Sequence, residues 1–225
     1  MGWTWGYGAN QSKGNTIEHN HLHDIGKEML SDMGGIYTLG MQPGTAIRNN
    51  LIHDIYSFTY GGWGIYPDEG SSEILIENNV VYRCKSAGFH QHYGRENVVR
   101  NNIFAFNRDS QVMRTRAEPH LSFTFEQNIV YFDSGVLLGS NWTGEQFKLN
   151  RNVYFDVRGG EVRFAGKTFS EWQRQGQDAE SVVADPGFVN AGNFNFALRP
   201  DSPARKLGFR PIDLSTVGPR SGVGR

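Results

Sequence analysis

The chain has 225 residues, a formal net charge of −1 and an aromatic content of 13%. This length fits one domain with a sizeable core, and the balanced charge does not favour nucleic-acid binding. No apolar run is long enough to span a bilayer, the single cysteine excludes an internal disulfide, and the start of the chain shows no signal peptide.

A nine-residue motif returns along the chain: an apolar residue, two polar residues, an asparagine, then further apolar residues. Its six asparagines are Asn20, Asn50, Asn79, Asn102, Asn128 and Asn152. Repetition at this period is typical of a stacked solenoid, and the β-branched and aromatic content of each copy predicts a strand. Asparagine tolerates left-handed backbone dihedrals, and its amides can hydrogen-bond between coils about 4.8 Å apart. We therefore predict a right-handed parallel β-helix of six to seven coils over residues 1–166.

A second apolar strand is expected in each coil after the motif. In the first two coils it is preceded by long segments, GKEMLSDMGG from Gly26 and YSFTYGGWG from Tyr56. Loops on one face of a repeat protein usually form its binding surface. These two segments should wall a groove whose floor is the second strand of coils one to four, with Trp63 above the floor.

Period-two alternation predicts which side chains of the second strand face the groove. With Ile36, Ile65 and Phe89 inward, the predicted outward residues are Tyr37, Leu39, Tyr66, Asp68, His90 and His92. In the fourth coil, strict register would bury Arg114, which is costly without a partner. We therefore expect a one-residue slip that turns Arg114 and Arg116 outward. Aromatic faces beside planar charged groups suit sugar rings, so an oligo- or polysaccharide is the expected partner.

Asp32 and Asp68 are the candidate catalytic carboxylates, because glycoside hydrolysis needs two such groups on either side of one bond. Each also fits a plain turn or capping role. Asp32 lies about seven positions before the equivalent of Asp68, so the pair meets only if the loop from Gly26 to Gly35 curls back over the floor. Glu69 is a competing partner, although alternation points it inward or into the turn.

His92 should neighbour Asp68 from the next coil, and His90 should neighbour Tyr66. A histidine there can bond a sugar hydroxyl or share a proton with the carboxylate. Alternate histidines plus one carboxylate are a weak metal signal, so we predict no metal and no cofactor.

Three long segments, DMGGIYTLGMQPGTAIRNNLIHDI, YGGWGIYPDEGSSEILIENNVVY and GFHQHYGRENVVRNNIFA, resemble bacterial right-handed β-helix proteins grouped with glycoside hydrolase family 141. WQRQGQD, DPGF and SPARKLGF extend the likeness over nearly the whole chain. The resemblance implies fucosidase- or xylanase-like activity on plant-type polysaccharides, with Asp32 and Asp68 as the catalytic pair. It also implies a secreted or periplasmic protein. Members of that group usually carry more coils before WTWGYG, and an uncapped first coil would favour end-to-end self-association.

The remaining chain, residues 167–225, should form a cap with a short helix from Thr168 and an irregular tail, because it is rich in proline. Glycoside hydrolysis is the preferred function. A polysaccharide lyase acting on uronates is the alternative enzyme, and would use His90, His92, Arg114 and Arg116. A non-catalytic glycan-binding or structural β-helix is the third interpretation.

Overall fold

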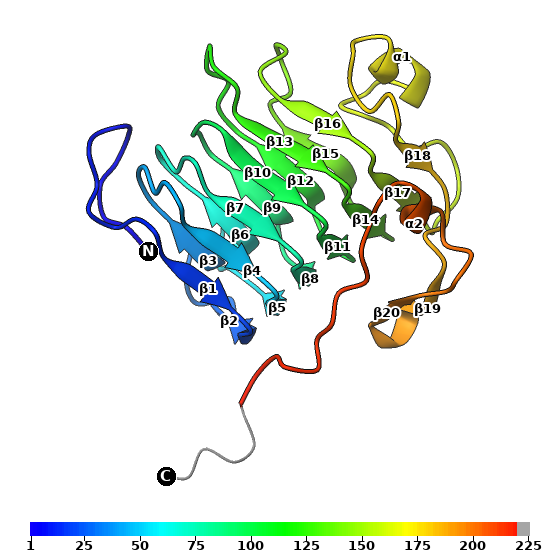
Figure 1. Ribbon diagram of the computed structural model, residues 1–225, viewed down its shortest axis with the longest axis horizontal. Coiled ribbons are helices and arrows are strands. Elements are labelled where there is room, and N and C mark those ends of the chain that lie inside the picture. Colours follow the sequence, from blue (N-terminus) through cyan, green and yellow to red (C-terminus); the bar gives the residue numbers. More distant parts are fainter. Residues whose placement is uncertain (220–225) are drawn as a thin grey trace.

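The computed structural model describes residues 1–219, and the last six residues lie outside this description. The chain winds into a stack of coils with three parallel sheets along its sides (Figure 1). The first sheet contains β1 (Thr16–Glu18), β4 (Ala46–Arg48), β7 (Leu75–Glu77), β10 (Asn97–Arg100), β13 (Phe123–Glu126) and β16 (Lys148–Asn150). The second sheet contains β2 (His21–Ile25), β5 (Leu51–Ile55), β8 (Val80–Cys84), β11 (Ile103–Ala105), β14 (Ile129–Phe132), β17 (Val153–Asp156) and β18 (Val182–Val183).

The third sheet contains β3 (Gly34–Thr38), β6 (Trp63–Pro67), β9 (Ala87–Gln91), β12 (Ser110–Arg114) and β15 (Val136–Ser140). Five coils therefore carry three strands each, and a sixth, β16 and β17, carries two. The predicted parallel solenoid and its number of coils are confirmed. Within residues 1–219, no helix is both long and apolar enough to cross a membrane.

The sequence predicted two strands per coil, and the structure has three, because the repeated motif contains a corner. The residue directly before each shared asparagine has a left-handed φ of between 52° and 58°. This bend separates a strand of the first sheet from a strand of the second. The left-handed conformation thus belongs to the neighbour of the shared asparagine, and non-glycine residues rarely adopt it without local support.

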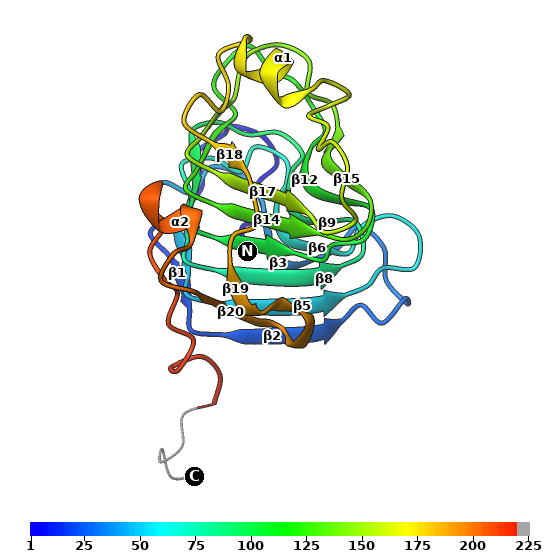
Figure 2. The same ribbon diagram turned by 90° about the vertical axis from the view of Figure 1, so that its right-hand side faces the viewer.

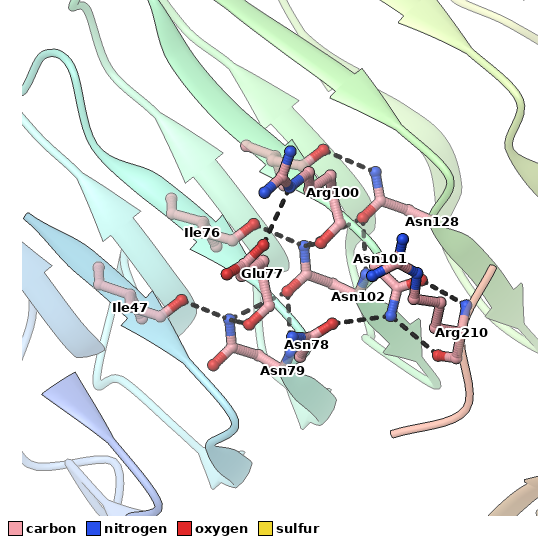
Figure 3. Close-up of polar contacts among 11 residues, drawn as sticks. Ile47, Ile76, Glu77, Asn78, Asn79, Arg100, Asn101, Asn102, Asn128 and Arg210 are labelled. Atoms are coloured by element: carbon pink, nitrogen blue, oxygen red, sulfur yellow. Dashed lines mark hydrogen bonds and ion pairs between the residues drawn. The ribbon is translucent and has the colours of Figure 1, made fainter. Parts of the chain in front are cut away.

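The predicted asparagine ladder supplies that support, and Figure 3 shows its middle part. The side-chain amide of Asn79 donates to Asn102 Oδ1 at 3.0 Å, and Asn102 donates to Asn128 Oδ1 at 3.0 Å. The five amides from Asn50 to Asn152 each also donate to a carbonyl of the coil below, as Asn102 does to Ile76 at 3.0 Å. The amides are fully buried, so these bonds satisfy groups that would otherwise be costly to bury.

The residues after β17 close one end of the stack and then return along its side (Figures 1 and 2). Helix α1 (Phe169–Gln173) has Thr168 as its N-cap, as predicted, and Thr168 forms a capping box with Glu171. Its Trp172 is buried in the core cluster beneath the last coil. The hairpin of β19 (Phe188–Asn190) and β20 (Asn195–Leu198) covers the outer face of the second sheet, and α2 (Pro203–Lys206) follows it.

The segment after α2 runs back along the stack toward the first coil (Figure 1). The side-chain amide of Gln127 donates to the carbonyl of Leu207, and the backbone N–H of Arg210 donates to Asn101 Oδ1 at 2.6 Å. Farther along, Gly218 N–H donates to the carbonyl of His19 at 3.0 Å. The residues predicted as a cap therefore have two roles. Those up to α2 close the last coil, and those after α2 form a strap, a segment that runs along one corner of the stack and bonds the earlier coils.

Candidate functional site

The outer face of the third sheet carries a stack of aromatic rings. Tyr37 and Tyr66 occupy equivalent positions on β3 and β6, and their rings lie 4.6 Å apart. The ring of His90 on β9 is parallel to that of Tyr66 at 4.8 Å, with 9° between the two planes. The predicted outward alternation is correct for these three residues. Tyr66 and His90 line a cavity, whereas Tyr37 lies beside it and is not part of its lining.

Trp63 belongs to the floor itself and does not stand above it. Its ring lies 4.2 Å from Tyr66 and 4.4 Å from His90, and the residue is only 5% exposed. A side chain at the equivalent position of the previous coil would collide with this packing. That position is Gly34, where an added Cβ would lie 2.9 Å from the Cβ of Tyr66.

Asp68 lies directly after β6 and is held by several donors. His92 Nδ1 is 2.9 Å from Asp68 Oδ1, as the coil register predicted, and the Tyr37 hydroxyl donates to Oδ2. Burial pushes the pKa of Asp68 upward, but hydrogen bonds from His92, Tyr37, Tyr66 and the backbone of Glu69 outweigh it. The net result is a pKa below the usual aspartate value. Asp68 is therefore a carboxylate at neutral pH.

Asp32 reaches the same cavity because its loop curls over the floor. Asp32 has a left-handed φ of 50°, and its N–H donates to the carbonyl of Tyr60 at 2.9 Å. Phe58 N–H donates to the carbonyl of Leu30 at 2.6 Å, so the two long loops run side by side. The Tyr66 hydroxyl donates to Asp32 Oδ1 at 3.3 Å, and it also interacts with the Asp68 carboxylate, whose pKa it lowers. The Tyr66 hydroxyl therefore lies beside both carboxylates.

These side chains enclose a cavity of about 310 Å³. It is lined by Asp32, Tyr60, Trp63, Tyr66, Asp68, Glu69, His90, His92 and Thr115. Seven of these nine residues were singled out from the sequence. Tyr60 and Thr115 were missed, although Thr115 follows β12 at the position that continues the outward row of Asp68 and His92.

His90 is a neutral member of the floor. Burial, followed by the charge of His92, lowers the pKa of His90 to about 3. Its Nε2 contacts the Thr115 hydroxyl, and its Nδ1 is buried without a partner among residues 1–219. His90 can therefore act as a hydrogen-bonding group at neutral pH but carries no charge there.

The expected slip in the fourth coil is wrong, and Arg114 points inward. β12 keeps strict register, with Val112 opposite Phe89 and Arg114 opposite Gln91. Arg114 is 0% exposed, and its Nε donates to the carbonyl of Asn141 at 2.9 Å. Its guanidinium also lies 4.7 Å from the ring centroid of Phe147. Carbonyl groups in the loop of the next coil accept from Nε and Nη2, whereas Nη1 is buried without a partner among residues 1–219.

Arg116 and Glu69 occupy the surroundings of the cavity. Arg116 lies over the ring of Tyr93 at 4.4 Å, 3.6 Å from a carboxylate oxygen of Glu118, and does not line the cavity. Glu69 was expected to point inward or into the turn. It faces the cavity instead, with its carboxylate 3.4 Å from the Tyr93 hydroxyl. In the part of the chain that the structure describes, no three His, Cys, Asp or Glu side chains are arranged to hold a metal ion.

Comparisons with known proteins agree with this architecture. The chain is 29% identical over 207 residues to the uncharacterized protein YwoF of Bacillus subtilis (strain 168), an alignment that covers 87% of this chain. The chain spans only 38% of that relative's length. A family model described as a right handed beta helix region matches residues 5–159, well over half of the chain. The protein therefore belongs to the right-handed β-helix family.

Proposed function

We propose that this protein hydrolyses glycosidic bonds in a complex polysaccharide, with the bond bound in the cavity on the third sheet. The observation that carries the proposal is that Asp32 and Asp68, from different coils, line one cavity, with the Tyr66 hydroxyl beside both carboxylates. A floor of stacked aromatic rings suits the apolar faces of sugars, and the histidines and Glu69 can bond hydroxyl groups.

The pKa of Asp68 suggests how the two carboxylates divide the work. Glycosidases use one carboxyl group as a proton donor and keep the other ionised. Because hydrogen bonds keep the pKa of Asp68 low, it is the natural base or nucleophile. Asp32 is then the proton donor to the leaving oxygen. The loop that carries Asp32 is exposed, so it can adjust when substrate binds.

The substrate class comes from the resemblance to glycoside hydrolase family 141 in the segments around Asp32, Asp68 and His92. It favours plant-type polysaccharides and fucosidase- or xylanase-like action. Membership of the β-helix family is consistent with a role on polysaccharides. Such polymers lie outside cells, which favours a secreted or periplasmic location.

The inward position of Arg114 makes hydrolysis preferable to lyase chemistry. A lyase must stabilise an anion formed beside a uronate carboxylate, and cationic groups usually do this. Arg114 bonds backbone carbonyls inside the stack, and Arg116 does not line the cavity. Among the residues that line it, no arginine or lysine is present.

The test is to incubate the protein with fucosylated and xylan-type polysaccharides and analyse the sugar ends released. Asp68→Asn and Asp32→Asn should each lower kcat/KM by about 10²–10⁴-fold, as expected for loss of an acid–base group. Asp201→Asn, at an exposed position, is the matched control and should retain full activity. Unsaturated products would identify a lyase. Binding without turnover by the wild type would identify a glycan-binding module.

The open side of the first coil suggests a second copy of the chain as a partner. Ile17, Leu22 and Ile25 are only partly buried, whereas their equivalents in the second coil are completely buried. We propose that two chains associate through this surface. Light scattering at rising concentration should show dimers that Leu22→Lys abolishes, and a strictly monomeric wild type would refute the proposal.

A further inference from the structure

A second cavity, of about 390 Å³, lies away from the third sheet, where the cap meets the solenoid. Its solenoid side is formed by residues at or just after the ends of second-sheet strands, and its cap side by the turn between β19 and β20. It is lined by Tyr56, Arg83, Cys84, Phe106, Arg108, Asp133, Ser134, Gly192 and Phe194. Its size is that of an ordinary small-ligand pocket.

The two arginines of this cavity, Arg83 and Arg108, differ in whether they form an ion pair. Arg83 Nε donates to Asp54 Oδ1 at 2.7 Å, so its charge is already paired. Arg108 has no ion pair with any carboxylate among residues 1–219, and its guanidinium lies over the ring of Tyr56 at 5.1 Å. A guanidinium stacked on a ring keeps its planar edge available for a bidentate bond to a carboxylate.

The walls beside Arg108 are aromatic and fixed. The ring of Phe194 stacks on Tyr82 at 4.7 Å, with 14° between the planes, and lies 6.1 Å from Phe106. Phe194 has a φ of 56°, which is unusual for a bulky residue and is often found at functional sites. This conformation holds the ring against Tyr82, beside the cavity.

Hydroxyl-binding groups complete the lining. Ser134 Oγ donates to Asp133 Oδ1 at 3.1 Å, and Asp133 is exposed, so its other carboxylate oxygen, Oδ2, can accept a hydrogen bond from a ligand. The cavity therefore combines Arg108, which has no ion pair among residues 1–219, with aromatic walls and hydroxyl acceptors. A simple anion would use the cation but would meet the charge of Asp133. A neutral sugar would leave Arg108 unused.

We propose that this cavity binds an acidic sugar, a uronate unit whose carboxylate pairs with Arg108 while its hydroxyls bond Asp133 and Ser134. No bond is made or broken in this site, so it acts as an anchoring site for an acidic polysaccharide. The proposal goes beyond the hydrolysis proposed above and does not depend on it.

Calorimetric or NMR titration with D-glucuronate and with D-glucose tests the proposal. Glucuronate should bind saturably and at least about tenfold more tightly than glucose, because a charge-assisted bidentate bond is lost with the neutral sugar. Arg108→Gln should abolish this preference. Arg163→Gln, an exposed arginine paired with Glu161, is the matched control and should preserve it. Equal affinity for both sugars, no binding, or an unchanged preference in Arg108→Gln would overturn the proposal.

Two further variants make the result specific. Asp133→Asn should weaken binding of both sugars, since it removes a charged acceptor for hydroxyls and leaves Arg108 intact. Asp68→Asn, which disables the proposed hydrolytic site, should bind glucuronate like the wild type. Loss of glucuronate binding in Asp68→Asn would place the binding on the third sheet and refute the second site, whatever the outcome of the activity assays.

Discussion

Two buried aspartates, Asp68 beside the groove and Asp178 in the cap, receive several hydrogen bonds each, yet their pKa values are shifted in opposite directions. Asp178 is 0% exposed, and burial raises its pKa although Ser181, Asn152, Trp172 and Tyr154 all donate to it. Asp68 is 5% exposed, and its donors, led by His92, lower its pKa. In both aspartates the donors favour the ionised form, but they outweigh the cost of burial only in Asp68, at the edge of a cavity.

The two aspartates also differ in their expected roles, one structural and one catalytic. Asp178 ends the asparagine ladder, because Asn152 Nδ2 donates to its Oδ1 at 3.1 Å. It joins the last coil to Trp172 of α1, whose Nε1 donates to Oδ2 at 2.8 Å. Asp68 also connects neighbouring coils, through Tyr37 and His92, but it does so at the edge of a cavity. We therefore expect stability to depend on Asp178 and activity to depend on Asp68.

The largest predicted effect is that of Asp178→Ala on stability. Four buried donors would lose their acceptor, and each unpaired buried donor costs about 1–3 kcal/mol. We expect the free energy of unfolding to fall by at least about 3 kcal/mol, measured by urea denaturation. Glu180→Ala, two residues away at the surface, should change it little. Equal effects of the two substitutions would show that the cap does not rest on Asp178.

A smaller effect distinguishes the two tyrosines that donate to these carboxylates. Tyr154→Phe removes a buried bond of 2.9 Å to Asp178 and should cost about 1–2 kcal/mol of unfolding free energy. Tyr37→Phe should cost less than about 1 kcal/mol, because water can replace the hydroxyl at the groove.

Tyr37→Phe should instead raise the pKa of Asp68, which NMR titration of the carboxyl carbon would measure. The acid limb of kcat/KM should move to higher pH with it. A larger loss of stability in Tyr37→Phe than in Tyr154→Phe would contradict the division between groove and cap.

The pH dependence of stability should show slopes of opposite sign. The folded pKa of Asp68 is lowered, so its contribution is present above about pH 4, the unfolded value, and is lost as pH falls through the folded pKa. The folded pKa of Asp178 is raised, so its contribution is present below about pH 4 and is lost as pH rises through the folded pKa.

Unfolding free energies of Asp68→Asn and Asp178→Asn, measured from acid to neutral pH, test these signs. As pH rises, the wild type should gain stability relative to Asp68→Asn and lose stability relative to Asp178→Asn. Parallel curves for the two variants would show that folding does not shift the pKa values of Asp68 and Asp178 in opposite directions.

The repeat pattern was enough to predict the solenoid, the ladder and the neighbourhood of Asp68 and His92, because coil register follows directly from spacing. It was not enough for groups whose partners come from loops. Arg114 was misplaced because its acceptor, the carbonyl of Asn141, lies in an irregular segment of the next coil. Asp178 was overlooked for the same reason: its donors come from the last coil, α1 and Ser181.

The position of Asp32 lay between these cases. The sequence showed that Asp32 can reach Asp68 only if its loop curls back over the floor, but it did not show whether the loop does so. The loop's backbone bonds to the parallel loop of the next coil, such as Asp32 N–H to the carbonyl of Tyr60, determine the outcome. The corner inside each motif was also missed, because a left-handed residue before asparagine has no fixed identity: it is His19 in one coil and Arg151 in another.

The strap formed by the residues after α2 has a consequence for the order of folding. Coils of a solenoid touch only their neighbours, so they can form one after another. The strap breaks this rule, because Gly218 bonds His19, 199 residues earlier in the chain. A growing chain can therefore stack its early coils but cannot form this bond to the first coil until Gly218 has been made. A contact between residues so far apart in sequence should form late in folding, after the coils have stacked on their neighbours. It then holds the first coil in place.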